Sequence, residues 1–219
     1  EVGATVGFAG PRVVAHRSTA EDAFASGSVD ALLEPGDGAG WIEGALGLRA
    51  VPLPRRGQPP PYEGSDGTAW GELQLARSPE RPTGIDWAAD LCSSWTELRG
   101  GDPVIRAGLA TMAGQRLVVV ASDRFERDGR PGPAAYRLAQ RAFALAGRLG
   151  LPVLTLVDTP GADPGPDSEA GGIAGEIART FAALDAVPTP TVSVCVGEGG
   201  SGGALALASA DRLLVQRHA

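Results

Sequence analysis

Residues 192–208 constrain the fold of this chain more than any other part of the sequence. They begin as an apolar, β-branched run, pass through five glycines in the seven residues 197–203, and continue as alanine and leucine, which predicts a buried strand, a tight turn and a helix start. Glycines leave the backbone N–H groups of such a turn uncovered at the positive end of a helix dipole. The turn can therefore hold an oxygen that gains negative charge, or it can simply let helix and strand pack closely; this stretch alone leaves both readings open.

Strands and helices alternate in the second half of the chain, which is typical of an α/β sheet with crossover helices. The predicted elements are a hairpin over 106–121, a helix over 134–149, a strand over 153–157, a helix over 173–184, the glycine-rich strand and helix, and a strand over 212–216. Two glycine-rich loops, 158–172 and 197–203, each follow a strand. Ligands of such sheets bind at the carboxyl ends of strands, so this coincidence favours a ligand site over close packing alone.

The first half of the chain has a weaker pattern. The expected elements are a short strand at 4–8, a helix starting within 9–14, a packed segment at 23–33 broken by Gly27, a proline- and glycine-rich linker at 51–68, an amphipathic helix at 69–77, and a helix from Asp86 or Asp90 through Leu98. Little in the linker is suited to a hydrophobic core.

Composition excludes several classes of function. The net charge of −7 argues against a nucleic-acid surface. No apolar run of about 18 residues and no signal-peptide pattern is present, so nothing indicates a membrane and a cytoplasmic location is the default. All 19 basic residues are arginine, so this stretch lacks the lysine of a P-loop or a Schiff base. Two histidines and two distant cysteines, Cys92 and Cys195, form no metal or redox motif.

From residue 69 onward, the chain resembles the α part of the carboxyltransferase of a biotin-dependent acetyl-CoA carboxylase. The stretches that carry the resemblance are 69–82, 135–139, 156–165 and 196–206. The last two are the most specific, because of their order and separation. The resemblance implies an α/β fold of the crotonase-like (ClpP/crotonase) type, a superhelix of ββα units.

Residues 1–50 resemble the end of the β part of the same carboxyltransferase. The stretch 7–14 carries its signature, and 27–32 resembles its closing helical region. The sequence is thus expected to be a piece of a fused β–α chain. We expect residues 1–50 to be the end of a β-like domain, 51–68 a linker, and 69–219 an α-like domain truncated at its C-terminus.

The resemblance implies a reaction and its participants. Carboxybiotin on a biotin carboxyl carrier protein gives its carboxyl group to a short acyl-CoA, such as acetyl-CoA or propionyl-CoA, forming malonyl-CoA or methylmalonyl-CoA. A biotin carboxylase component and a homo-oligomeric assembly are further implied, with no metal in this segment. Backbone N–H groups suit the two oxyanion sites that this chemistry needs, because they are oriented in advance and carry no acidic proton that would quench a carbanion.

The resemblance also implies roles for particular residues. Gly203 and Ala204 resemble the oxyanion pair that faces biotin, and a β-branched residue at 203 is expected to block it while leaving folding intact. Other residues expected on the biotin side are Gly199, Gly200, Gly202, Asp158, Thr159, Pro160 and Gly161. Glu198 is expected to hold the turn through backbone N–H groups. Arg137 is expected either to contact a phosphate or carboxylate or to lie on a solvated helix face.

Two departures from the family pattern leave other functions open. Asp163 stands where the family commonly has an aromatic residue, and the lysine-rich segment before Tyr136 is shortened to 128–133. One alternative is a decarboxylase of related fold that acts on a malonyl thioester. Another is an assembly subunit that has lost catalysis, although the retention of Gly203 and Ala204 argues against it.

Overall fold

A six-stranded mixed sheet forms the centre of the computed structural model, which describes residues 7–9, 14–15, 18–34, 36–55 and 67–219. The strand order is β10-β9-β8-β7-β6-β5. The strands are β5 (Ser94–Leu98), β6 (Ile105–Met112), β7 (Gln115–Ser122), β8 (Val153–Thr159), β9 (Thr191–Gly199) and β10 (Arg212–Val215). Pairing is antiparallel from β5 to β7 and parallel from β7 to β10, as the alternating pattern of the sequence predicts for β7 onward.

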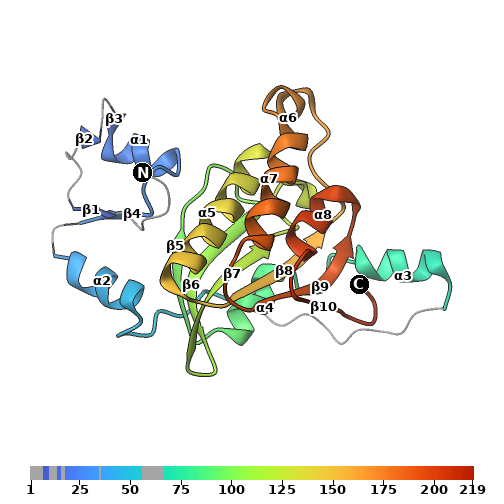
Figure 1. Ribbon diagram of the computed structural model, residues 1–219, viewed down its shortest axis with the longest axis horizontal. Helices are drawn as coiled ribbons and strands as arrows, with labels where there is room; N and C mark the ends of the chain where they lie inside the picture. The colour runs from blue at the N-terminus through green and yellow to red at the C-terminus, as the bar shows by residue number, and fades with distance from the viewer. Residues whose placement is uncertain (1–6, 10–13, 16–17, 35, 56–66) are drawn as a thin grey trace.

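Helices cover both faces of this sheet, as Figure 1 shows. The helices of this part of the chain are α3 (Ala69–Ala76), α4 (Gly84–Leu91), α5 (Pro133–Leu149), α6 (Pro166–Ala170), α7 (Ile173–Asp185) and α8 (Ser201–Ala208), with a short 3-10 turn at Arg127–Gly129. Helices α5, α7 and α8 pack on one face, and α4 packs on the other. The described residues include no helix that is both long and apolar enough to cross a membrane.

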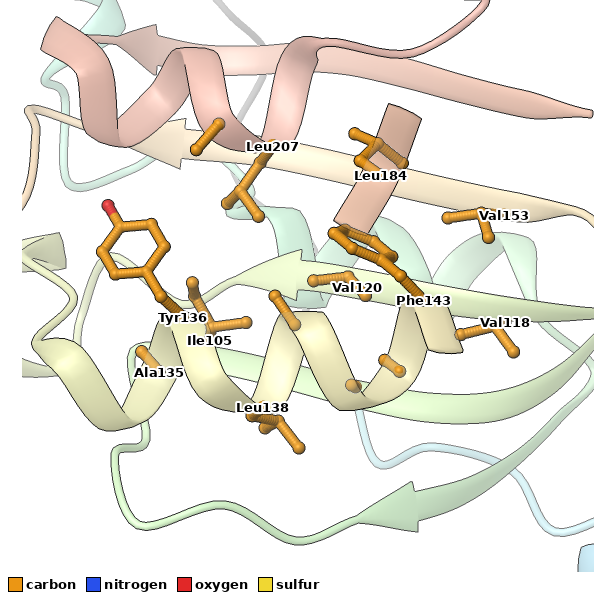
Figure 2. Packing of buried hydrophobic residues seen from close by; sticks show 14 of the residues in the cluster. Ile105, Val118, Val120, Ala135, Tyr136, Leu138, Phe143, Val153, Leu184 and Leu207 are labelled. Atoms are coloured by element: carbon orange, nitrogen blue, oxygen red, sulfur yellow. The ribbon is translucent and has the colours of Figure 1, made fainter. Parts of the chain in front are cut away.

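Strand alternation assigns side chains to the two faces. In β7, Val118 and Val120 point towards α5 and its neighbours, whereas Val119 packs with the α4 side. Phe143 of α5 has no exposed surface and lies among these strand residues (Figure 2). Both faces of the central strands are therefore buried, which holds the carboxyl ends of β8 and β9 in fixed positions.

The predicted hairpin is confirmed. Strands β6 and β7 pair along their whole length from Ile105↔Ser122 to Met112↔Gln115. Ala113 and Gly114 form the turn with φ values of 48° and 79°. Positive φ at both positions is the geometry of a two-residue type I′ hairpin, which matches the twist of the strands.

The prediction of one helix through Leu98 is wrong. Helix α4 ends at Leu91, and Ser94–Leu98 is strand β5 at the edge of the sheet. Trp95 and Thr96 have high strand propensity, and pairing with β6 decides the outcome at a position where the local pattern was ambiguous.

The N-terminal part forms small pairs of strands with two helices. The elements are β1 (Gly7–Ala9), β2 (Val14–Ala15), β3 (Ser18–Thr19), α1 (Ala20–Ala25), β4 (Ala31–Leu33) and α2 (Gly38–Leu46). The strand predicted at 4–8 includes Gly7 and Phe8 of β1, while residues 4–6 lie outside the described part.

Two helix expectations in this part fail. Val14 lies in β2 instead of the helix expected to start within 9–14, where residues 10–13 are outside the described chain. The expected helical region at 27–32 is a turn followed by β4, because Gly27 has a left-handed φ of 72° and Ala31 pairs with Gly7 of β1.

Asp30 ties this N-terminal part to the main sheet. Its carboxylate accepts from Arg141 of α5 at 2.6 Å and from the backbone N–H of Arg99, just after β5, at 2.8 Å. The Asp30 side chain is fully buried, so the ion pair is screened little by solvent.

The first residues of the expected linker, 51–53, pack against the main sheet. The Val51 carbonyl accepts from the Trp95 N–H at 2.7 Å, and Leu53 belongs to the core on the α4 side with 5% exposure. Residues 56–66 lie outside the described chain, and the domain boundaries remain a prediction.

Replacing Phe143 with alanine is expected to lower the free energy of unfolding by about 3–5 kcal/mol, because it leaves a cavity between α5 and the sheet. Denaturant unfolding measures the change. Leu149, half exposed at the end of the same helix, is the matched control, and Leu149→Ala is expected to cost less than about 1 kcal/mol. Equal losses in the two variants would contradict the packing described for α5.

Candidate functional site

The two glycine-rich loops meet at one edge of the sheet. Strands β8 and β9 run parallel, and their last pair joins Thr159 to Gly199. Beyond that pair, the Gly200 N–H donates to the Thr159 carbonyl at 2.9 Å. The expectation that both loops lie at neighbouring strand ends is therefore confirmed.

Gly200 allows these loops to touch. A β-carbon on residue 200 would lie 2.2 Å from the Pro160 carbonyl oxygen, a distance that real β-carbons do not show. Gly161 has a φ of 130°, a conformation that residues with a β-carbon rarely adopt. Its N–H donates to the Thr159 hydroxyl at 3.1 Å, and that hydroxyl donates to the Gly129 carbonyl at 2.6 Å. The loop after β8 is thus fixed against both β9 and the segment that precedes α5.

The N-terminal turn of helix α8 lies against this loop, since a β-carbon on Gly161 would be 3.1 Å from the β-carbon of Ser201. Ala204 makes the first i−4 bond of the helix, with its N–H on the Gly200 carbonyl at 3.2 Å. The N–H groups of Ser201, Gly202 and Gly203 precede that bond and have no partner within the helix. Ser201 is held at a φ of 63°, which is a strained conformation for a residue other than glycine.

The expected donor pair stays a prediction, and the structure shows a difference between its two members. The sequence placed Gly203 and Ala204 together, but the Ala204 N–H is already bonded within the helix. A β-carbon on residue 203 would lie 2.6 Å from the Ala162 nitrogen, so the backbone of Gly203 packs directly against that of Ala162. Within the described chain, the Ala162 N–H has no hydrogen-bond partner. The free donors are therefore Ala162 and the first turn of α8.

Tyr136 of α5 completes the surroundings of Gly203. A β-carbon on residue 203 would lie 2.5 Å from the Tyr136 hydroxyl oxygen. Tyr136 has no exposed surface, and its hydroxyl has no hydrogen-bond partner among the described residues, as it points towards α8 in Figure 2. An unpaired buried hydroxyl costs about 1–3 kcal/mol. Because the Tyr136 oxygen and the Ala162 nitrogen occupy the space that a β-carbon needs, a β-branched residue at 203 is now predicted to disturb the local packing as well as block the site.

The hydroxyl of Tyr136 stays protonated. Burial raises the pKa of Tyr136, and the negative charge of Asp102 raises it further. Sequence reasoning gave this residue no role. The sequence feature that could have pointed to it is a tyrosine on the buried, apolar face of α5, the face that also carries Ala139 and Phe143.

Asp158 anchors the end of β8 from the opposite face. It is 1% exposed, and its Oδ1 accepts from Arg81 at 2.5 Å and from the Glu198 N–H at 3.1 Å. Arg81 is itself buried and also donates to the Val196 carbonyl at 2.8 Å. Burial raises the pKa of Asp158, while the positive charges of Arg81 and Arg124 limit that rise. Arg81, which the sequence did not single out, joins both strand ends.

A cavity of about 500 Å³ opens beside Asp158. Its lining includes Arg77, Arg124, Arg130, Phe125, Pro160 and Glu198. Asp158 Oδ2 has no hydrogen-bond partner in the described part of the chain. The cavity therefore offers a buried acceptor and several guanidinium groups next to the loop after β8.

Glu198 has a different role from the one expected. Its carboxylate makes a two-point ion pair with Arg77, with Oε2 at 3.0 Å from Nε and Oε1 at 2.6 Å from Nη2. It ties β9 to the end of α3 instead of holding the turn through backbone N–H groups.

Arg137 does not point into the site. Its guanidinium pairs with Glu176 of α7 at 2.9 Å, and its side chain is 54% exposed. Against the opposing effect of burial, hydrogen bonds from Arg179, Gln140 and Arg137 lower the pKa of Glu176 to about 2. Arg137 thus fastens α5 to α7 on a partly solvated face.

Among the described residues, no group of three or more histidine, cysteine, aspartate or glutamate side chains is placed to hold a metal ion. Asp163, which departs from the family pattern, accepts from Arg127 at 3.0 Å and from the Ser168 hydroxyl at 2.6 Å. It therefore organises the loop that leads into α6.

Comparison with known proteins identifies a family and several relatives. The model described as acetyl co-enzyme A carboxylase carboxyltransferase-like matches residues 65–219. The fused β/α carboxyl transferase subunits of Salinispora tropica acetyl-CoA carboxylase are 40% identical over 254 residues, covering all of this chain and 45% of that protein. The α subunit of Zymomonas mobilis is 44% identical over 165 residues, covering 69% of this chain and 53% of that subunit. The chain spans about half the length of these relatives.

Solved structures support the fold. The hexameric transcarboxylase 12S core aligns with a TM-score of 0.69 at 20% identity, over 93% of this chain and 42% of that one. A malonate decarboxylase heterodimer from Pseudomonas aligns with a TM-score of 0.54 at 26% identity, over 63% of each chain. The expected crotonase-like α/β fold is confirmed.

Arg81→Met is expected to destabilise the protein by about 3–5 kcal/mol, because it leaves the Asp158 carboxylate buried without its charged partner. Unfolding of the double variant with Asp158→Asn should recover part of that loss. Arg55→Met serves as the control, since its ion pair with Asp90 is exposed on both sides and should contribute at most about 1 kcal/mol. A double variant as unstable as Arg81→Met alone would refute the coupling.

Proposed function

The chain belongs to the acetyl-CoA carboxylase carboxyltransferase-like family, and from that premise we propose that it acts in carboxyl transfer from carboxybiotin to acetyl-CoA or another short acyl-CoA. The partners of this reaction are a biotin carboxyl carrier protein and a biotin carboxylase component. We place the reaction in the cytoplasm and expect a homo-oligomeric assembly.

One observation carries the proposal. The free N–H groups of Ala162 and of the first turn of α8 lie together where two parallel strands end. Bound carboxybiotin would supply the carboxyl group, and its ureido oxygen gains negative charge as that group leaves. Neutral backbone donors suit such an oxygen because they are already oriented and need no rearrangement during the reaction. The positive end of the α8 dipole acts in the same direction.

The residues around these donors hold the two loops close together, and the glycines among them place no side chain over the donors. Gly200 brings the two loops into contact, and the glycine at 161 adopts a φ that other residues avoid. Asp158 and Arg81 hold the two strand ends from the opposite face. On this proposal, Asp158, Thr159, Pro160 and Gly161 position the donors instead of reacting.

Asp163 and the shortened segment before α5, the two departures from the family pattern, both make hydrogen bonds within the loop region. Asp163 is bonded at both carboxylate oxygens, since Oδ1 accepts from the Gly165 N–H at 3.0 Å and Oδ2 from Arg127 and Ser168. The shortened segment before α5 also contributes a contact, with the Pro131 carbonyl accepting the Asp163 N–H at 3.0 Å. This order favours a catalytic protein over an assembly subunit that has lost activity.

Decarboxylation of a malonyl thioester is the second candidate. The likeness to a Pseudomonas malonate decarboxylase heterodimer supports keeping it. Both reactions place negative charge on an oxygen near backbone donors, so the donor set does not separate them. Dependence on biotin does, because only the transferase needs biotin as the carboxyl acceptor in the reverse direction.

The test uses the whole protein that contains this chain, without the biotin carboxyl carrier protein and the biotin carboxylase component, so that added biocytin is the only biotin present. Consumption of malonyl-CoA and of methylmalonyl-CoA is followed with and without biocytin. Loss that requires biocytin supports carboxyl transfer, and the faster substrate identifies the acyl series. Loss without biocytin supports the decarboxylase. No loss in either case, from folded protein, contradicts both.

Gly202→Val is expected to lower the transfer rate about a hundredfold or more, because the side chain covers the N–H groups of the first turn of α8. Residue 202 has room for a side chain, with Ile177 the nearest neighbour at 3.9 Å, so the melting temperature should stay close to that of the parent. Leu205→Val on the exposed face of the same helix is the control and should keep both activity and stability. Normal transfer by Gly202→Val would remove this turn from the site.

A further inference from the structure

Tyr136 carries a polar hydroxyl into a cluster of buried hydrophobic residues. Its ring lies in the core between α5 and α8, with no exposed surface (Figure 2). Its hydroxyl has no hydrogen-bond partner among the described residues. A buried polar group without a partner calls for a specific explanation, such as a role in catalysis.

The hydroxyl lies next to Gly203, as does the backbone nitrogen of Ala162. It is 2.5 Å from the position of a β-carbon on Gly203, and the Ala162 nitrogen is 2.6 Å from the same position. Three elements therefore meet there: the loop after β8, the first turn of α8 and the first turns of α5. The same contact leaves glycine as the residue that fits at 203 without displacing a neighbour.

Other contacts hold the backbone and ring of Tyr136 in place. Pro133 starts α5 at its first position, where its missing N–H costs nothing. The Tyr136 carbonyl faces the Thr180 hydroxyl of α7 at 3.5 Å. The hydroxyl of Tyr136 is thus delivered to Gly203 by a rigid helix and not by a loop.

We propose that Tyr136 is a positioning residue for the backbone donors of this site: its hydroxyl oxygen sets the spacing between the Ala162 N–H and the first turn of α8. The oxygen and the Ala162 nitrogen both border the space beside Gly203, at 2.5 Å and 2.6 Å from the position that a β-carbon on residue 203 would take. Removal of the oxygen leaves a void of one atom, into which the loop after β8 or the first turn of α8 can shift. Because donor strength depends steeply on distance and angle, a small shift weakens the hydrogen bonds that form as charge develops.

This inference rests on the proposed carboxyl transfer, and the parent protein assayed in parallel tests that function by itself. The variant Tyr136→Phe is made in the whole protein, assayed without the biotin carboxyl carrier protein and the biotin carboxylase component. We expect kcat of biocytin-dependent malonyl-CoA consumption to fall tenfold or more, with KM for the acyl-CoA unchanged. We also expect the melting temperature to stay equal or rise, because the variant removes a buried hydroxyl that has no partner.

Loss of activity together with unchanged or higher stability is a result that a packing role does not produce. Phe143→Leu, on the same helix and equally buried, is the control: it should lower stability and leave kcat per folded protein unchanged. Full kcat in Tyr136→Phe, from a parent protein that is active, overturns the inference and leaves the proposed function standing. An inactive parent overturns the proposed function instead.

A second variant pair checks the geometry directly. Gly203→Ala places a methyl group against both the Tyr136 oxygen and the Ala162 nitrogen, so it should lower kcat and stability. Adding Tyr136→Phe removes one of these two collisions and should recover part of the stability of Gly203→Ala. No recovery would show that the hydroxyl does not occupy the space next to residue 203.

Discussion

The close approach of Gly200 to the Pro160 carbonyl is the contact on which the site depends. It brings the loop after β8 against the turn after β9, and only a residue without a β-carbon permits it. The Gly200 N–H then bonds to Thr159, and the Gly200 carbonyl starts helix α8 by accepting from Ala204. Gly200 thus joins the loops that follow β8 and β9, and it also determines at which residue helix α8 begins.

The rest of the fold keeps that contact rigid from both faces of the sheet. On one face, the buried pair of Arg81 and Asp158 joins the ends of β8 and β9. On the other, α5 packs along the strands and brings Tyr136 against Gly203. Both arrangements have an energetic cost, since one buries charges and the other leaves a hydroxyl unpaired. Such costs are typical of sites where geometry must be held for function.

The local hydrophobic and glycine pattern was sufficient to predict those helices and strands whose own residues favour the structure that the surrounding fold also favours. The apolar run and the glycines within 192–208 predicted β9, its turn and α8, and the pattern over 106–121 predicted the hairpin of β6 and β7. Partners distant in sequence were not predictable. The pairing of Arg81 with Asp158, the bond between Arg77 and Glu198, and the strand state of Ser94–Leu98 each depend on contacts that form only in the folded sheet. Of the expected pair Gly203 and Ala204, Ala204 has its N–H bonded within the helix, because the first helical bond depends on where the cap lies.

Hydrogen–deuterium exchange of the whole protein, with and without saturating biocytin, tests the donor set most directly. The peptides to follow are those that contain residues 158–165 and 197–208, with the peptide that contains the hairpin turn at Ala113 as an internal reference. Biocytin is predicted to slow exchange in both glycine-rich loops and to leave the hairpin turn unchanged. Biocytin that supports carboxyl transfer without protecting either loop would contradict the placement of the site at this edge of the sheet.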